Sequence, residues 1–264
     1  MESSYLAPII ESHRARAARD QRDWRVRRRS RRRGSSFAEA LGGAASPYVA
    51  VIAEVKRRSP SRGWLDEHLD AASLARAYAD AGAVAVSVLT DEEFFAGRLD
   101  DLREVRSSVD LPVLRKDFTV CENDVLDAAE AGAAAVLLIV AALSDDELAR
   151  YVALADECDL DALVEVHDAD EITRAVDAGA QIIGVNQRNL HTFAVDPDHA
   201  QSLVAQIPRS CLAVCESGLS NVDDVGRAAR AGFDAVLVGE AFVSATDRDA
   251  TVRAFTHATR HQRG

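Results

Sequence analysis

Residues 111–118, LPVLRKDF, and residues 51–63, VIAEVKRRSPSRG, each pass from a short apolar run into polar residues. Lys116 and Lys56 stand at these two transitions, and no other lysine occurs among the 31 Lys and Arg residues of the chain. Arginine stays charged at any accessible pH, whereas burial and neighbouring charges can tune a lysine to exchange its proton. The placement therefore indicates proton transfer; the alternative is a pair of solvated lysines.

Both stretches belong to a repeating pattern that begins at residue 48. Runs rich in Val, Ile, Leu and Ala predict strands at residues 49–55, 83–89, 112–115, 133–140, 162–166, 181–185, 212–215 and 235–238. Amphipathic patterns between and after them predict helices at residues 71–81, 99–107, 122–131, 145–157, 169–178, 197–207, 221–231 and 246–259. Near-continuous apolar strands alternating with helices indicate a parallel sheet covered by helices. Eight such units predict an α/β fold, a (β/α)8 TIM barrel with an N-terminal helical extension. The alternative is a doubly wound open sheet, but no GxGxxG follows the first strand.

The domain organisation follows from where the repeat begins. Residues 1–47 form the predicted extension, in which residues 1–20 and 36–41 have helix-forming composition, and residues 48–264 form the predicted catalytic barrel. Residues 1–34 carry a net charge of +7, which leaves −19 on the remainder. Such an acidic body argues against nucleic acid as a partner. We interpret the run RVRRRSRRRG at 25–34 as a basic arm that folds against the acidic domain of the same chain, or as a polyanion-binding segment.

Other features of the sequence argue against a membrane protein, a secreted protein and a metal-binding protein. No apolar run approaches the roughly 18 residues of a membrane span, and the first residues do not resemble a signal peptide, so we expect a cytoplasmic protein without membrane contact. The four cysteines form no CxxC pair, and no His/Cys cluster has zinc spacing, so we expect no metal. We expect a monomer or a weak homo-oligomer.

Polar side chains follow the carboxyl ends of the predicted strands, where the active sites of (β/α)8 barrels lie. In strand order they are Glu54, Lys56 and Ser59; Lys116 and Asp117; Glu165 and His167; Asn186 and Arg188; Glu216 and Ser217; Gly239 and Glu240. Two lysines facing several carboxylates form a general acid/base set. Alternatively, Glu54 and Glu216 only pair with the lysines, and Asn186 is a turn residue. His167 is interpreted as a loop residue and is not included, and Asp117 either orients Lys116 or begins the loop.

Two further patterns indicate what binds at this rim. CESGLS and LVGEAF place Gly218 and Gly239 at the ends of the last two strands, where exposed backbone N–H groups favour a phosphate; the alternative is two tight turns. Ser59 and Arg188 can add contacts to this anion. Apolar residues in loops predict a pocket for a flat apolar ligand portion. They are Pro60, Trp64, Phe94, Phe95, Phe118 and Leu190.

The combined motifs resemble the indole-3-glycerol phosphate synthase family over about residues 36–256. They are IAEVKRRSPSRG (52–63), SVLTDEEFFAG (87–97), LPVLRKDF (111–118), LLIV (137–140), LVEVHD (163–168), IIGVNQRNL (182–190), CESGL (215–219) and VLVGEAF (236–242). The resemblance implies a carboxy-lyase of tryptophan biosynthesis that needs no cofactor. Its substrate would be 1-(2-carboxyphenylamino)-1-deoxyribulose 5-phosphate, and its reaction would be ring closure with loss of CO₂ and water.

The resemblance also implies roles for individual residues. Lys116 would be the general acid that protonates the ketone, Glu165 the general base of dehydration, and Lys56 either a carboxylate ligand or a second acid. The supporting polar shell would be Glu54, Asn186, Glu216 and Ser217. The phosphate end would hold Ser59, Gly218, Gly239 and the backbone N–H of Glu240, and the anthranilate pocket Pro60, Phe95, Phe118, Leu137 and Leu190. The arginine run departs from the family's usual composition.

Two other functions stay open on the sequence. Lys116 can instead be a Schiff-base nucleophile in an aldolase-like phosphate-binding barrel. A non-enzymatic alternative is an anion or nucleic-acid binder that uses the arginines between residues 25 and 33.

Overall fold

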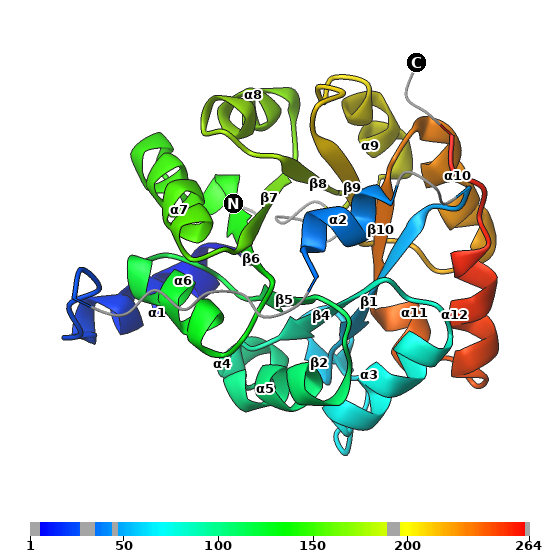
Figure 1. Cartoon of the computed structure of the whole chain (residues 1–264), viewed down its shortest axis with the longest axis horizontal. Helices are drawn as coiled ribbons and strands as arrows, with labels where there is room; N and C mark the ends of the chain where they lie inside the picture. The colour runs from blue at the N-terminus through cyan, green and yellow to red at the C-terminus, as the bar shows by residue number, and fades with distance from the viewer. Residues whose placement is uncertain (1–5, 27–34, 44–46, 189–195, 262–264) are drawn as a thin grey trace.

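Eight parallel strands close into a barrel surrounded by helices, as Figure 1 shows in a computed structural model. The structure describes residues 6–26, 35–43, 47–188 and 196–261. The barrel strands are β1 (Ala50–Val55), β4 (Ala85–Leu89), β5 (Val113–Lys116), β6 (Ala135–Ile139), β7 (Asp161–Val166), β8 (Ile182–Asn186), β9 (Leu212–Glu216) and β10 (Ala235–Val238). The ring closes where β1 pairs with both β4 and β10. The predicted (β/α)8 barrel is therefore confirmed, and every strand lies within two residues of its predicted bounds.

The eight predicted helices of the barrel are also present. They are α3 (Ala71–Asp80), α5 (Leu99–Ser108), α6 (Glu122–Glu130), α7 (Asp145–Glu157), α8 (Ala169–Asp177), α9 (Pro197–Val204), α10 (Val222–Ala231) and α12 (Arg248–Thr256). Side-chain caps fix several helix starts; for example, the Ser144 hydroxyl accepts from the backbone N–H of Glu147 at the start of α7. The last helix begins two residues later than predicted because Asp247 caps it, and it ends three residues earlier than predicted, at Thr256.

Sequence periodicity does not reveal the short elements in the loops, because each spans only two to four residues. They are the hairpin β2 (Arg58–Ser59) and β3 (Gly63–Trp64), the one-turn helices α4 (Glu92–Phe95) and α11 (Glu240–Val243), and the 3₁₀ turn η1 (Val140–Ala142). Asp91 holds α4 in place, because its carboxylate accepts from the backbone N–H groups of Phe94 and Phe95.

Alternation along the strands sorts side chains between the barrel interior and the helix layer. On β1, Val51, Ala53 and Val55 pack outward in the larger buried cluster, whereas Ile52 lies in the inner cluster. The same inward row continues to Glu54 and reaches the rim of the barrel. The inward rows of β5, β7 and β9 likewise end in Lys116, Glu165 and Glu216. The fold therefore carries polar side chains at the last inward position of alternate strands.

The N-terminal extension contacts both ends of the barrel. Helix α2 (Phe37–Gly42) lies across the end nearest the viewer in Figure 1, and its fully buried Phe37 and Leu41 join the inner cluster. The Ser36 hydroxyl donates to Asp161 at the start of β7, 2.9 Å away. Helix α1 (Leu6–Arg19) lies at the opposite end, where its Arg14 guanidinium donates to Glu147 of α7. The boundary at residues 47 and 48 stays a prediction.

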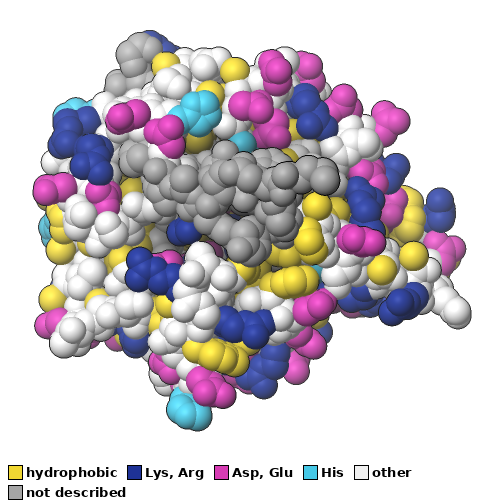
Figure 2. Space-filling view, turned by 180° about the vertical axis from the view of Figure 1, so that it is seen from behind, with side chains coloured by type: hydrophobic (Ala, Val, Ile, Leu, Met, Phe, Trp, Pro, Cys, Tyr) yellow, Lys and Arg dark blue, Asp and Glu magenta, His cyan; other side chains and the backbone are white. Residues whose placement is uncertain are grey.

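The outer surface is strongly charged. Figure 2, seen from the side opposite α2, shows acidic and basic side chains interspersed around the face that bears the strand carboxyl ends. None of the helices in the described ranges combines the length and the apolar character that a membrane-spanning segment needs.

Candidate active site

A cavity of about 490 Å³ opens at the carboxyl ends of the strands. This volume lies within the usual range for small-molecule sites. Most of the candidate residues from the sequence that the structure describes line it: Glu54, Lys56, Ser59, Pro60, Phe95, Lys116, Phe118, Leu137, Glu165, Asn186, Arg188, Glu216, Ser217, Gly218, Gly239 and Glu240. Leu190 lies outside the described residues. Phe94 and Trp64 do not line the cavity, and Trp64 is 51% exposed, with the Arg58 guanidinium 5.5 Å from its ring centroid.

The two lysines each pair with carboxylates. The Lys56 ammonium lies 2.9 Å from Glu54 Oε1. The Lys116 ammonium lies 3.7 Å from Glu165 Oε2 and 3.5 Å from Glu216 Oε2. The lysines come from β1 and β5, and the two carboxylates beside Lys116 come from β7 and β9, so the barrel alone brings these groups together.

These charges reinforce one another in a site with little solvent. Burial lowers the pKa of Lys116, but the charges of Glu216, Glu165 and Glu54 outweigh it and raise that pKa above its ordinary value. Burial raises the pKa of Glu54, but Lys56 and Lys116 outweigh it and lower that pKa. Lys116 is therefore held as an ammonium at neutral pH, as a general acid must be.

Glu216 is the exception among the carboxylates. Burial raises its pKa to about 8, and the nearby charges of Glu165 and Glu54 act in the same direction against Lys116. Both of its carboxyl oxygens are shielded from water and make no hydrogen bond within the described part of the chain. The raised pKa favours the protonated form of Glu216, which can donate as well as accept a proton.

Two glycines leave room for these carboxylates. A Cβ atom on Gly184 of β8 would lie 2.0 Å from Glu216 Oε1, and one on Gly239 would lie 2.5 Å from Glu54 Oε1. Both positions therefore require glycine because a side chain would displace a carboxylate of the site. For Gly239 this is a reason for glycine that the sequence did not reveal.

Asn186 acts as more than a turn residue. Its side-chain amide donates to Glu165 Oε1 at 3.0 Å, while its carbonyl oxygen accepts from the backbone N–H of Arg188, also at 3.0 Å. Because both ends of the amide are engaged, Asn186 fixes the orientation of the Glu165 carboxylate.

The cavity is polar at its end next to the residues that follow β9 and β10. The carboxylate of Glu240 is paired with the Nε atom of Arg62, a residue of the β2–β3 turn that the sequence did not single out. Ser217 and Gly218 both have left-handed backbone conformations, with φ of 64° and 70°. Such a conformation at a non-glycine residue is uncommon and often marks a functional site.

The opposite side of the cavity is apolar. The rings of Phe95 and Phe118 lie 6.1 Å apart between centroids, and Leu137 lies beside them in the cavity wall. Leu6 and Ile9 of α1 complete the wall. Helix α1 of the predicted N-terminal extension is therefore part of the site.

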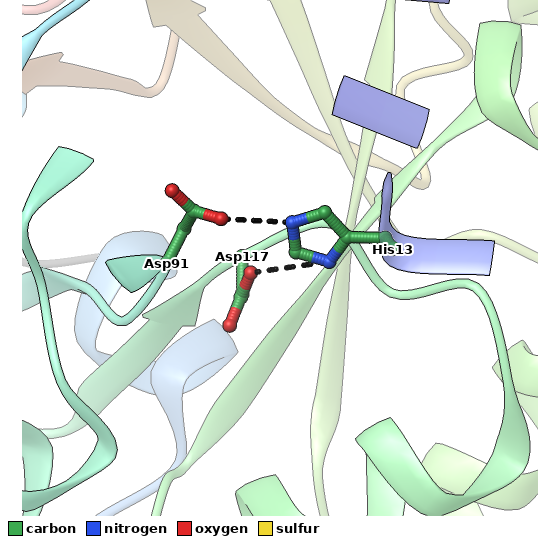
Figure 3. A group of neighbouring side chains, drawn as sticks. All are labelled: His13, Asp91 and Asp117. Atoms are coloured by element: carbon green, nitrogen blue, oxygen red, sulfur yellow. Dashed lines mark hydrogen bonds and ion pairs between the residues drawn. The ribbon is translucent and has the colours of Figure 1, made fainter. Parts of the chain in front are cut away.

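A buried histidine attaches α1 to the barrel (Figure 3). His13 Nε2 lies 2.8 Å from Asp91 Oδ2, and its Nδ1 lies 3.9 Å from Asp117 Oδ1. The His13 ring also packs on Phe118, at 5.1 Å between centroids. These three residues come from distant parts of the sequence, so no local spacing could have revealed the group.

The same three side chains have the geometry of a cation site, since their ligand atoms lie within 4.8 Å of one another. The protein itself meets their hydrogen bonds, however. Arg16 contacts His13 Nδ1 at 2.8 Å, and Arg115 donates to Asp117 at 2.9 Å. With two guanidinium groups this close, the cluster is explained as an ion-pair network that holds α1.

Asp117 and His167 lie in the loops after β5 and β7, as the sequence allowed, and both have contacts that it did not reveal. Asp117 turns away from Lys116; it binds Arg115 and Thr90 and accepts from the backbone N–H of Phe118, so it begins the loop. His167 is not a free loop residue, because its Nε2 lies 3.5 Å from Glu165 Oε1. Alternation two residues after Glu165 was the signal that could have placed it there.

Comparison with known proteins identifies the family. The sequence model described as indole-3-glycerol phosphate synthase matches residues 7–255. The chain belongs to the indole-3-glycerol phosphate synthase family. The match includes α1, whereas the resemblance seen in the sequence began near residue 36.

Named relatives agree with this family. An indole-3-glycerol phosphate synthase from Nocardioides sp. is 53% identical over 207 residues, covering 78% of this chain and 80% of the relative. One from Micrococcus luteus is 50% identical over 225 residues, covering 85% and 84%. Among solved structures, the chain is similar in fold to tryptophan synthase subunit alpha from Legionella pneumophila, with a TM-score of 0.62 at 14% identity, covering 83% of this chain and 96% of that one.

Proposed function

We propose that this chain is an indole-3-glycerol phosphate synthase that uses the cavity residues described above. It closes the ring of 1-(2-carboxyphenylamino)-1-deoxyribulose 5-phosphate and releases CO₂ and water, without a cofactor. The observation that carries the proposal is the Lys116 ammonium, 3.7 Å from Glu165 and 3.5 Å from Glu216 in a cavity with one apolar side and one polar end.

The substrate has a matching polarity. Its aromatic ring fits against Phe95, Phe118 and Leu137, with Pro60 and the sequence-predicted Leu190 as further contacts. Its phosphate fits the polar end, where Ser59 and Arg188 contribute side chains, and Gly218, Gly239 and Glu240 contribute backbone. The pairing of Arg62 with Glu240 supports this, because it neutralises a carboxylate that would repel the phosphate.

Ring closure and dehydration then need a proton donor and a proton acceptor beside the reacting carbon atoms of the substrate. Lys116 donates a proton to the ketone oxygen as the aromatic carbon attacks the carbonyl carbon, so that a C–C bond forms and a hydroxyl group results. Loss of CO₂ leaves its electron pair to the ring. Glu165 then accepts a proton from the ring carbon between the nitrogen and the hydroxyl-bearing carbon. The ammonium of one of the two lysines donates a proton to the hydroxyl, which leaves as water, and the C=C bond that forms completes the indole.

Lys56 of the same cavity has two possible roles in this reaction. Its pairing with Glu54 supports a role either as ligand of the substrate carboxylate or as a second proton donor. Asn186 and Ser217 complete the polar shell. We expect the enzyme to act in the cytoplasm on this small phosphorylated substrate, as a monomer or a weak homo-oligomer.

The Schiff-base alternative requires Lys116 as a neutral amine. The raised pKa of Lys116 disfavours that form in the free enzyme. Borohydride added during turnover distinguishes the two mechanisms. A covalent adduct at Lys116 would replace the acid/base mechanism with the nucleophilic one.

The variant Lys116→Arg tests the proposed acid. Arginine keeps the charge between the two carboxylates but does not release a proton at accessible pH, so we expect kcat to fall at least about 10²-fold. Lys56→Arg makes the same change at the chain's other lysine and separates its two open roles, because a ligand of the substrate carboxylate tolerates arginine whereas a second proton donor does not. Near-normal turnover of Lys116→Arg, measured by indole fluorescence, would refute the assignment of Lys116.

The anion-binding alternative concerns arginines that lie mostly outside the described residues. Deleting residues 1–34 would not isolate it, because the deletion also removes Leu6, Ile9 and His13 from the site. Replacing the six arginines between residues 27 and 33 by serine is the cleaner test. Unchanged turnover with lost polyanion binding would assign the run to a separate activity.

A further inference from the structure

His167 follows the last residue of β7 and is held between two glutamates. Glu171 of α8 accepts from the His167 backbone N–H at 2.7 Å and lies 3.1 Å from its Nδ1. The other ring nitrogen, Nε2, lies 3.5 Å from Glu165 Oε1. That nitrogen is shielded from water and has no hydrogen-bond partner in the part of the chain that the structure describes.

An orphaned buried nitrogen is unusual, because most buried polar atoms are hydrogen-bonded. The contact with Glu171 explains why the ring is held, but it leaves Nε2 unexplained. This nitrogen points at the carboxylate that the proposed reaction uses as its base. A histidine with only a packing role would not need a second ring nitrogen that faces a carboxylate.

The charges around the ring favour its protonated form. Burial lowers the pKa of His167, but the hydrogen bond to Glu171 and the charges of Glu165, Glu171 and Glu216 outweigh it and raise that pKa. These groups come from β7, α8 and β9. From α9, the side chain of His199 contacts the His167 carbonyl oxygen at 2.9 Å. In the imidazolium form both ring nitrogens are donors.

One proton can reside on either Glu165 or Glu216. Both flank Lys116, and two carboxylates that share one cation do not both ionise readily. The two carboxylates differ in their hydrogen-bond partners. Glu165 accepts from Asn186 and also faces His167, whereas the Glu216 oxygens make no hydrogen bond in the described ranges.

We infer that His167 is a positioning residue that keeps Glu165 as the ionised member of this pair and leaves the shared proton on Glu216. Glu165 is then ready to accept a proton during dehydration. This inference rests on the proposed function, because it assigns Glu165 as the base of that reaction.

The test is the pH dependence of kcat/KM for the full chain carrying His167→Gln, measured from pH 5 to 9. Without the imidazolium charge, we expect the acid limb to move to higher pH by at least about one unit, the lower end of the effect of an opposite charge at 4–6 Å. Below the limb this equals at least about a tenfold loss in kcat/KM, and the two profiles should converge above the limb, where the base is ionised with or without the imidazolium charge.

Two controls accompany this variant. Glu171→Gln keeps the imidazole but removes a carboxylate that stabilises its charge, so the limb should move in the same direction by less. His199→Gln removes the contact with the His167 carbonyl oxygen and should leave the limb unchanged.

Each outcome decides the inference. An unshifted acid limb in His167→Gln, or an equal loss at every pH, would overturn it and leave His167 with a packing role. If His167→Gln does not fold, the limb of Glu171→Gln decides instead. If the wild-type chain does not turn over the substrate, the proposed function has failed rather than this inference.

Discussion

At the scale of single residues, the site depends on unequal environments for similar side chains. Glu54 and Glu216 are both buried glutamates, yet Glu54 has its pKa lowered by two lysines, while burial raises that of Glu216 to about 8. The sequence placed both at strand ends but could not distinguish them. The difference comes from the lysines: Lys56 lies 2.9 Å from Glu54, whereas the lysine beside Glu216 is Lys116, which lies 3.5 Å away and is shared with Glu165.

Glu216→Gln tests this assignment through stability. A carboxyl whose pKa is raised in the folded state binds more protons there than in the unfolded chain, so wild-type stability falls as pH rises from about 4.5 to about 8. The slope can reach about 1.4 kcal/mol per pH unit. Glutamine cannot titrate, so the variant should gain stability relative to wild type as pH rises through this window. Urea unfolding at several pH values measures it, and a constant difference would contradict the raised pKa.

At the scale of elements, α1 is the part that the sequence described least well. Its helical composition was recognised, but its place over the cavity was not, because the contacts that fix it join residues about 80 and 100 positions apart. His13 connects α1 both to Asp91, which caps α4, and to the ring of Phe118 in the cavity wall. The helix therefore belongs to the apolar side of the site.

His13→Ala should release α1. The change leaves two buried carboxylates without this partner and removes a ring from Phe118, so we expect KM to rise roughly tenfold, about 1.4 kcal/mol of lost binding, with a smaller effect on kcat. Ser12→Ala is the control on the same helix, because its hydroxyl contact with Glu93 is exposed. Trp24 fluorescence in a Trp64→Phe background reports on the position of the segment. Unchanged KM and fluorescence would mean that α1 stays docked without His13.

At the scale of the whole molecule, the fold could be predicted because its signals are local and repeated. Eight apolar runs and their helices specify a closed barrel, and closure by itself brings Lys116, Glu165 and Glu216 together. The extension could not be predicted in this way, because it occurs once and has no repeat. Its two helices contact opposite ends of the barrel, α1 at the cavity and α2 beneath the inner core.

Phe37→Ala tests the closure of the barrel by α2. Phe37 is fully buried in the inner cluster, so its truncation should lower the free energy of unfolding by about 3–5 kcal/mol. Turnover at low temperature should persist because the cavity lies at the other end. Val222→Ala, at a side chain that is 43% exposed, should change stability by less than about 0.5 kcal/mol. Equal effects of the two changes in chemical unfolding would show that α2 does not stabilise the barrel.

The most direct test of the whole account is the product that the wild-type chain makes. Purified protein is mixed with 1-(2-carboxyphenylamino)-1-deoxyribulose 5-phosphate in buffer without added cofactor, and indole fluorescence is followed together with released CO₂. We predict that the two products form in equal amounts and that Lys116→Arg forms neither at a comparable rate. Absence of indole fluorescence with a folded wild-type chain would contradict the proposed function.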